Sequence, residues 1–253
     1  MYLDVQGSGP ELVLIHGWAM HGGIFAPLLA ELTPHFRVHV VDLPGHGHGR
    51  DDPHFDVGDS ARRIAAATPR ALWVGWSLGG LVALRGALDH AEQVRGIALI
   101  ASSPRFVSAA DWPHGVPTDV FAAFATDLGE RYRDAIERFL ALETLGAPNA
   151  QAELRELRKQ VFERGEPALG ALTDGLRALD SVDLRAQVPT LAMPSLWIAG
   201  RRDRLVAPAE MQWAAERAPQ GRFVELNSGH APFIGHAAEV AHAIGAFAAD
   251  LPA

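Results

Sequence analysis

The stretch from residue 71 to residue 80, with the sequence ALWVGWSLGG, constrains this chain more than any other. An apolar run short enough for a buried strand stops at Gly75, and apolar residues at helical spacing begin at Leu78. Between them, the letters GWSLG fit the pattern G-x-S-x-G, in which a sharp strand-to-helix turn holds a serine in a strained backbone conformation. We therefore predict that Ser77 is a nucleophile. A glycine-rich turn without catalytic function is the alternative interpretation.

Short apolar runs alternate with helical patterns in the first and last parts of the chain. We predict buried strands over residues 11–17, 36–43, 71–75, 94–101, 195–200 and 222–226. We predict helices between or after them over residues 25–32, 57–68, 78–88, 209–218 and 237–249. This alternation predicts an α/β fold with a mostly parallel, doubly wound sheet. In such a sheet the active groups lie on loops at the carboxyl ends of the strands.

The middle of the chain has a different pattern, without a buried strand. Amphipathic helices are predicted there over residues 120–128, 130–145, 151–164 and 167–179. We therefore predict a core formed by residues 1–104 and 189–253 and a helical lid formed by residues 105–188. Large apolar residues of the lid favour either an aliphatic acyl substrate or a core within the lid itself; they are Phe106, Trp112, Phe121, Phe124 and Phe139.

A serine hydroxyl needs a base to remove its proton, and the base needs an acid to fix its tautomer. In this architecture the order along the chain is serine, acid, histidine. Asp203 follows the strand 195–200 and His230 follows the strand 222–226, so both fall on the expected loops. Because the base must be neutral, kcat/KM should fall on acidification through roughly pH 6 to 7.

Each of these two residues also has an alternative interpretation. Asp203 stands among three arginines and could be a surface ion-pair partner, while His230 could be a capping or packing residue. Alternative acids occur in the predicted lid at Asp111, Asp180 and Asp183. The positions after the strands favour Asp203 and His230.

Acyl transfer also needs hydrogen-bond donors where the oxyanion forms. The backbone N–H of Leu78, the residue after the nucleophile, should supply one at the start of a helix. The loop after the strand 11–17 should supply the second, and Trp18 is our candidate there. Its indole would then face the acyl group, unless Trp18 is only a core aromatic.

Composition narrows the remaining function classes. A net charge of −8 does not favour nucleic acid or an anionic membrane as partner, and the absence of cysteine excludes thiolate chemistry. We find no signal peptide and no apolar run long enough to span a membrane, so we expect a cytoplasmic location. His46 and His48 alone are a weak metal signal, and no nucleotide-binding motif is present, so we expect neither a metal nor a cofactor.

Together the motifs resemble those of an α/β-hydrolase over nearly the whole chain. The motifs are HGW at 16–18, DLPGHG at 42–47, GWSLGG at 75–80, GRRD at 200–203 and GHAPF at 229–233. More narrowly, GWSLGG, HAPFI and the lid segment ERFLAL at 137–142 resemble the esterases that act on pimeloyl-[acyl-carrier protein] methyl ester in biotin synthesis.

This resemblance implies hydrolysis of a methyl ester on a carrier-bound acyl chain, by a monomer without cofactor. It implies a substrate-binding set of Trp18, Ser77, Leu78, Phe139, Glu143 and His230, although the family has glutamine where this chain has Glu143. Phe139 and Glu143 are four residues apart and would share a helix face. It also implies that Arg138 and Arg155 contact the acidic carrier protein, where a solvated helix face is an equally good interpretation.

Two alternatives to this function stay open. A general short-acyl carboxylesterase would use the same residues without a carrier protein. A non-catalytic ligand receptor on the same scaffold would bind without turnover, since fold does not fix function. Dehalogenase and epoxide-opening reactions are disfavoured, because they use a carboxylate nucleophile where this chain has Ser77.

Overall fold

A computed structural model describes residues 1–252; Ala253, the last residue of the predicted core, lies outside the described residues. One seven-stranded sheet forms its centre, in the order β1-β3-β2-β4-β5-β6-β7. The strands are β1 (Tyr2–Gly7), β2 (Glu11–Ile15), β3 (Arg37–Asp42), β4 (Ala71–Trp76), β5 (Val94–Ile100), β6 (Ser195–Gly200) and β7 (Gly221–Leu226). All neighbours pair in parallel except β1 and β3, which are antiparallel. The predicted α/β fold with a mostly parallel sheet is confirmed.

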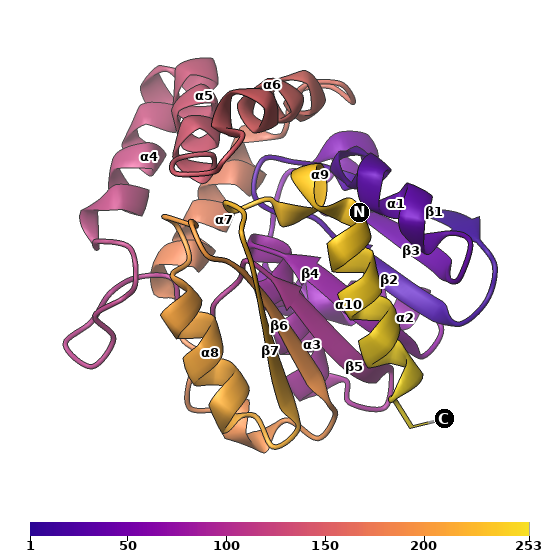
Figure 1. The fold of residues 1–253 in the computed structure, drawn as a ribbon. Helices are drawn as coiled ribbons and strands as arrows, with labels where there is room; N and C mark the ends of the chain where they lie inside the picture. The colour runs from indigo at the N-terminus through magenta and orange to yellow at the C-terminus, as the bar shows by residue number, and fades with distance from the viewer. Residues whose placement is uncertain (253) are drawn as a thin grey trace.

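Helices cover both faces of the sheet. The core helices are α1 (Ala26–Leu32), α2 (Val57–Ala67), α3 (Leu78–Asp89), α8 (Pro208–Arg217), α9 (Pro232–Gly235) and α10 (Ala237–Ala249). Single turns of 3-10 helix occur at Gly22–Phe25, Gly47–Gly49 and Val188–Thr190. Helix α1 packs against α10 and α2 packs against α3, with the sheet between the two pairs (Figure 1). Among the helices of residues 1–252, none is long and apolar enough to cross a membrane.

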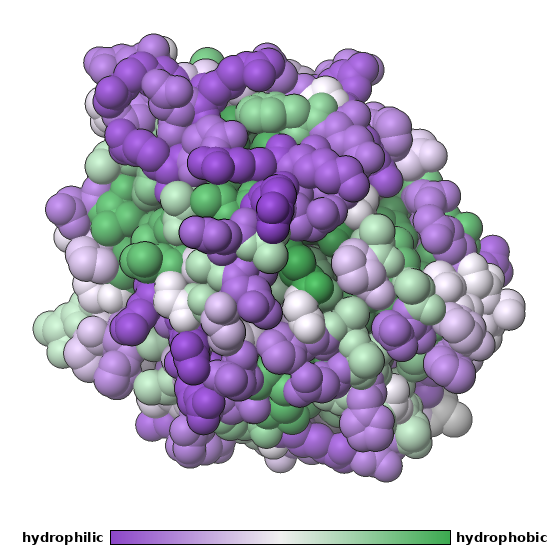
Figure 2. Space-filling view, turned by 45° about the horizontal axis from the view of Figure 1, so that its top comes forward, coloured by the Kyte–Doolittle hydropathy of each residue, from purple (hydrophilic) through white to green (hydrophobic). Residues whose placement is uncertain are grey.

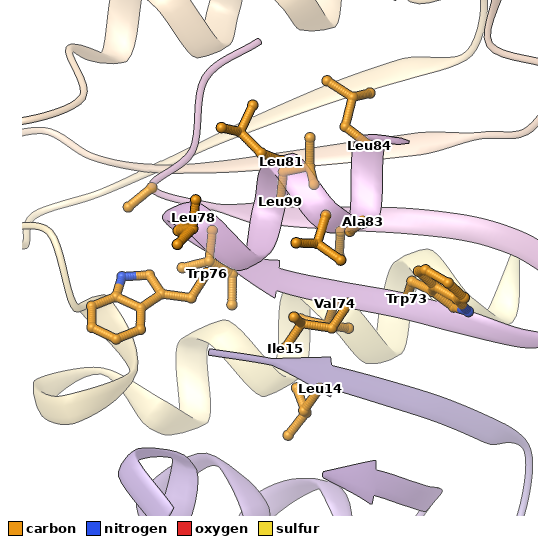
Figure 3. Packing of buried hydrophobic residues seen from close by; sticks show 14 of the residues in the cluster. Leu14, Ile15, Trp73, Val74, Trp76, Leu78, Leu81, Ala83, Leu84 and Leu99 are labelled. Atoms are coloured by element: carbon orange, nitrogen blue, oxygen red, sulfur yellow. The ribbon is translucent and has the colours of Figure 1, made fainter. Parts of the chain in front are cut away.

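Strand β4 lies in the middle of the sheet, and every residue of it is buried. A strand covered on both faces needs a continuous apolar run, which explains the sequence ALWVGW. Helix α3 packs directly on β4 and β5, so it is apolar around most of its circumference. Figure 3 shows Leu78 and Leu81 of α3 beside Trp76 and Leu99. This packing fixes the turn between β4 and α3.

Four helices between β5 and β6 form the segment predicted as a lid. They are α4 (Asp119–Glu130), α5 (Tyr132–Glu143), α6 (Ala150–Val161) and α7 (Leu169–Ser181). Helices α4 to α6 stand over one end of the sheet (Figure 1), and the face seen from above them is largely hydrophilic with apolar patches between (Figure 2). The helices predicted over 120–128 and 130–145 correspond to α4 and α5, which are separated at Arg131.

Candidate active site

Ser77 occupies the turn between β4 and α3 in a strained conformation, with φ 54° and ψ −120°. A Cβ on Gly75 would lie 2.3 Å from the carbonyl oxygen of Gly79, and one on Gly79 would lie 2.3 Å from that of Ile15. Only glycine allows the strand and helix to approach this closely. The N–H of Ser77 donates to the carbonyl of Ile100 at 3.0 Å, which ties the turn to β5.

Ser77, His230 and Asp203 come from three different loops and form one chain of hydrogen bonds. His230 Nε2 lies 2.9 Å from Ser77 Oγ, and His230 Nδ1 lies 2.8 Å from Asp203 Oδ2. The other carboxylate oxygen of Asp203 accepts from the N–H groups of Leu205 and Val206, at 2.8 and 3.0 Å. These contacts leave Asp203 little freedom to turn away from His230. With Nδ1–H donated to Asp203, the neutral imidazole presents a free electron pair to Ser77.

The electrostatic surroundings of His230 favour its protonated form. Its side chain is fully buried, and burial by itself disfavours the imidazolium. The negative charge and hydrogen bond of Asp203, together with Glu143, outweigh burial and raise the pKa of His230 above its usual value. The imidazole is thus a stronger base than a histidine in water, as proton abstraction from a serine requires.

The amides of Trp18 and Leu78 are free to bind an anion near Ser77. Leu78 is the first residue of α3, where a backbone N–H has no partner within the helix. Across residues 1–252, neither amide donates to a backbone or side-chain acceptor. The two expected donors thus have the freedom that an oxyanion site needs.

Helices of the lid cover Trp18 and the serine. The Trp18 indole donates to the carbonyl of Leu172 in α7 at 2.9 Å, and its ring packs on Phe139 of α5 with centroids 4.5 Å apart. Phe139 in turn packs on Phe124 at 5.2 Å. Trp18, Ser77 and Phe139 are all 0% exposed, so the structure shields the serine from solvent.

Glu143 of α5 is the unusual group in this site. Its side chain is 1% exposed, and neither carboxylate oxygen has a hydrogen-bond partner. Burial raises its pKa to about 8, while the nearby His230 lowers it and Asp203 raises it further. At neutral pH this side chain is therefore mostly an uncharged carboxylic acid.

The alternative acids of the lid bind elsewhere. Asp183 accepts hydrogen bonds from Arg105 and Arg185, and Asp111 forms an ion pair with Arg185. Asp180 is exposed. Of the four carboxylates considered from the sequence, the structure brings Asp203 to His230.

The glycine-rich loop after β3 is tightly packed. The buried His46 ring lies 5.2 Å from that of His16, and its Nδ1 donates to the carbonyl of Pro44. Burial lowers the pKa of His46 to about 4 and, with His46 nearby, that of His16 to about 3, so both rings are neutral. No group of three metal-ligating side chains occurs in the part of the chain that the structure describes.

Sequence reasoning missed several supporting residues. Ser102, directly after β5, donates from Oγ to the carbonyl of Ser77 at 2.8 Å, and the Trp76 indole donates to the carbonyl of His230 at 2.8 Å. Glu210 is fully buried near Asp203, and burial raises its pKa to about 8. The position of Ser102 at the carboxyl end of a strand was a usable signal, whereas nothing in the sequence marked Glu210 as buried.

The two arginines expected at a carrier protein differ in their surroundings. Arg138 is exposed and pairs with Asp127. Arg155 is exposed on α6, and within residues 1–252 no carboxylate pairs with it.

Comparison with known proteins fits this geometry. The pattern of the Alpha/beta hydrolase family matches residues 12–243. The chain is 54% identical over its full length to the pimeloyl-[acyl-carrier protein] methyl ester esterase of Xanthomonas campestris pv. campestris (strain B100), which is also covered in full. It is 53% identical to the esterase of the same name from Stenotrophomonas maltophilia (strain K279a), covering 99% of this chain and 97% of that one.

Solved structures share the fold at lower identity. An esterase from Exiguobacterium antarcticum superposes with a TM-score of 0.84 at 21% identity, covering 97% of this chain and 94% of the other. An enol-lactonase from Burkholderia xenovorans LB400 superposes with a TM-score of 0.85 at 22% identity, covering 98% and 96%. The chain therefore belongs to the alpha/beta hydrolase family, and within it to the group of the pimeloyl-[acyl-carrier protein] methyl ester esterases.

Proposed function

We propose that this protein is a serine carboxylesterase that hydrolyses the methyl ester of pimeloyl-[acyl-carrier protein] methyl ester in biotin synthesis. The observation that carries the proposal is the hydrogen-bonded chain from Ser77 through His230 to Asp203, all three of which are buried. The substrate rests on the full-length similarity to esterases of that name. We place the reaction in the cytoplasm and assign it to a monomer.

The reaction proceeds in two halves. His230 takes the proton of Ser77 as its oxygen attacks the ester carbonyl, and the N–H groups of Trp18 and Leu78 bind the oxyanion. Methanol leaves with the proton from His230, and the acyl group stays on the serine. A water molecule, deprotonated by His230, then releases the free carboxylic acid. The far end of the acyl chain keeps its link to the carrier throughout.

The acyl chain is assigned to the space between Trp18 and the lid. Phe139 and Trp18 offer aromatic faces to methylene groups, and their contact indicates where the chain would insert. Glu143, on the same face of α5, would lie beside the ester end because it interacts with His230 and Asp203. Arg155 and Arg138 are the lid residues assigned to the carrier protein.

Kinetics on two substrates test this function. We expect kcat/KM for the carrier-bound methyl ester to exceed that for p-nitrophenyl esters of short acids by at least tenfold, because carrier contacts add binding energy. Equal values would favour the general short-acyl esterase. Stoichiometric binding without turnover would favour the non-catalytic receptor. In cells, the gene should restore growth without biotin to a strain lacking this esterase, and the Ser77→Ala variant should not.

A further inference from the structure

Three arginines follow β6 and surround the acid of the catalytic chain. Arg201, Arg202 and Arg204 are exposed, while Asp203 between them is buried against His230. Arg201 Nη2 and Arg202 Nε both donate to Oδ1 of Asn227, at 2.9 and 3.1 Å. Within residues 1–252, no carboxylate forms an ion pair with any of the three. They carry unneutralised positive charge in a chain whose net charge is −8.

This pattern differs from that of most exposed arginines in the chain. Arg62 and Arg177, for example, pair with aspartates on their own helices, and Arg138 pairs with Asp127. An unpaired cluster on an acidic protein creates a local positive field against the overall charge. Arginine suits an anionic partner because its planar guanidinium binds carboxylate and phosphate with two parallel hydrogen bonds.

The cluster adjoins the edge of the lid beside the site. A Cβ on Gly146 would lie 3.0 Å from the carbonyl oxygen of Arg202 and 3.3 Å from Nε of Arg204. From Gly146 the chain runs through Ala147, which packs on Gly229 next to His230, into an open hollow lined by residues 147–152 and Arg155. Arg155 of the lid and the arginines of the β6–α8 loop therefore border the same short segment.

We propose that Arg201, Arg202 and Arg204, with Arg155 across the 146–152 segment, form the docking surface for the acidic face of the carrier protein. This proposal rests on the proposed function and identifies where its partner binds. It extends the contact from the lid, where Arg138 pairs with Asp127, to the boundary between lid and core. A carrier held there has its acyl arm beside the loops that hold Asp203 and His230.

Charge-neutralising variants test this surface. The triple variant Arg201→Gln, Arg202→Gln, Arg204→Gln should lower the ratio of kcat/KM for the carrier-bound ester to that for a soluble methyl ester about tenfold, because rim charges steer association. The matched control is Arg37→Gln, Arg62→Gln, Arg85→Gln, which changes net charge equally at sites away from the loop. The control should keep the wild-type ratio. Equal ratios in all three proteins would overturn the proposal.

Salt dependence of the wild-type enzyme gives a second readout that needs no variant to fold. Raising NaCl from about 50 to about 500 mM shortens the screening length to a few ångströms, so kcat/KM for the carrier substrate should fall several-fold. The value for the soluble ester should stay constant. A carrier reaction insensitive to salt would contradict the docking surface but leave the proposed function intact. No hydrolysis of the carrier substrate at all would instead refute the proposed function.

Competition measurements distinguish the carrier protein from other anionic partners. Carrier protein without an acyl group should compete with the carrier-bound ester in wild type and weakly in the triple variant. Short double-stranded DNA or vesicles containing anionic lipid should not compete at equal phosphate concentration. Competition by either of them, and not by the carrier protein, would overturn the assignment of the partner.

Discussion

Two acidic side chains, Asp203 and Glu143, lie in the electrostatic surroundings of His230. Asp203 holds the ring by a hydrogen bond at 2.8 Å, whereas Glu143 has no hydrogen-bond partner. An uncharged acid beside the base leaves His230 neutral and leaves room for a neutral ester.

The pH dependence of kcat/KM should report the ionisation of His230. Because its pKa is raised, activity should fall on acidification with a midpoint above the ordinary histidine value of 6.5. Because Glu143 is itself mostly uncharged below about pH 8, Glu143→Gln should leave this midpoint close to the wild-type value. Phe124→Leu, a change at the same lid but away from the charges, is the control and should also leave the midpoint in place. A midpoint that moves to lower pH in Glu143→Gln alone would show that Glu143 is ionised beside His230.

The same substitution has a predicted effect on stability. The Glu143 carboxyl ionises near 4.5 in the unfolded chain and near 8 in the folded protein, so folding retains a proton between these values. The free energy of unfolding therefore decreases as the pH rises from about 4.5 to about 8. Glutamine does not titrate. The Tm of Glu143→Gln relative to wild type should rise between pH 5 and pH 8, by at least about 2 °C. A pH-independent difference would contradict a buried, neutral Glu143.

The positions of some of these residues could be predicted from the sequence, whereas the burial of Glu143 could not. Asp203 and His230 were placed from their position after strands, and the structure brings them together with Ser77, although their catalytic role stays a prediction. Trp18 was expected to face the acyl group, and its contact with Phe139 is compatible with that. The burial of Glu143 had no local signal, because only the packing of α5 on the core removes this carboxyl from water.

At the scale of elements, the lid is tied to the core beyond the end of α6. Arg164 Nη1 lies 3.1 Å from both carboxylate oxygens of Asp42, a residue 1% exposed at the end of β3. Arg50 donates to the carbonyl of Arg164, and His21 Nε2 lies 2.7 Å from that of Gln160. The opposite end of the same helix carries Glu153, which is buried with one oxygen unpaired. These contacts fasten the carboxyl end of α6 to the core.

Removing the contact between Arg164 and Asp42 should loosen the lid without removing any group from the catalytic chain. We expect Arg164→Ala to lower the free energy of unfolding by about 1 to 3 kcal/mol, because it leaves the buried Asp42 without its cation. Limited proteolysis should then cut faster within residues 105–188. Arg158→Ala, which removes an exposed pair with Glu137, is the control and should cost under about 1 kcal/mol. Equal cleavage and equal stability in the two variants would contradict the anchoring role of Arg164.

Element boundaries show what local patterns miss. β1 was absent from the predicted strands because most of its residues are exposed, and its pairing with β3 comes from tertiary structure. The break between α4 and α5 was predicted at Gly129, whereas the structure has it two residues later, at Arg131. Trp112, grouped with the apolar lid residues, packs instead on Trp213 of α8.

At the scale of the whole molecule, the parallel sheet of the core was easier to predict from the sequence than the relation of the lid to the core. Alternating apolar runs suffice for a parallel sheet, since each strand and helix buries its own apolar face. How the lid closes depends on contacts between residues more than 100 positions apart, such as Arg164 with Asp42. The same holds for the arginine cluster, whose lack of acidic partners is visible only in the folded chain. The lid boundaries at residues 105 and 188 stay predictions.

The central claim is that Ser77 removes the methyl ester from a carrier-bound acyl chain. Its most direct test is mass spectrometry of the intact carrier during incubation with enzyme. Wild type should convert the methyl ester to the free acid over many turnovers, with methanol as the other product. Ser77→Ala should be slower by roughly 10⁴-fold or more, because the nucleophile is lost while the oxyanion donors remain. Conversion at an equal rate in both proteins, or release of the whole acyl chain from the carrier, would contradict the account.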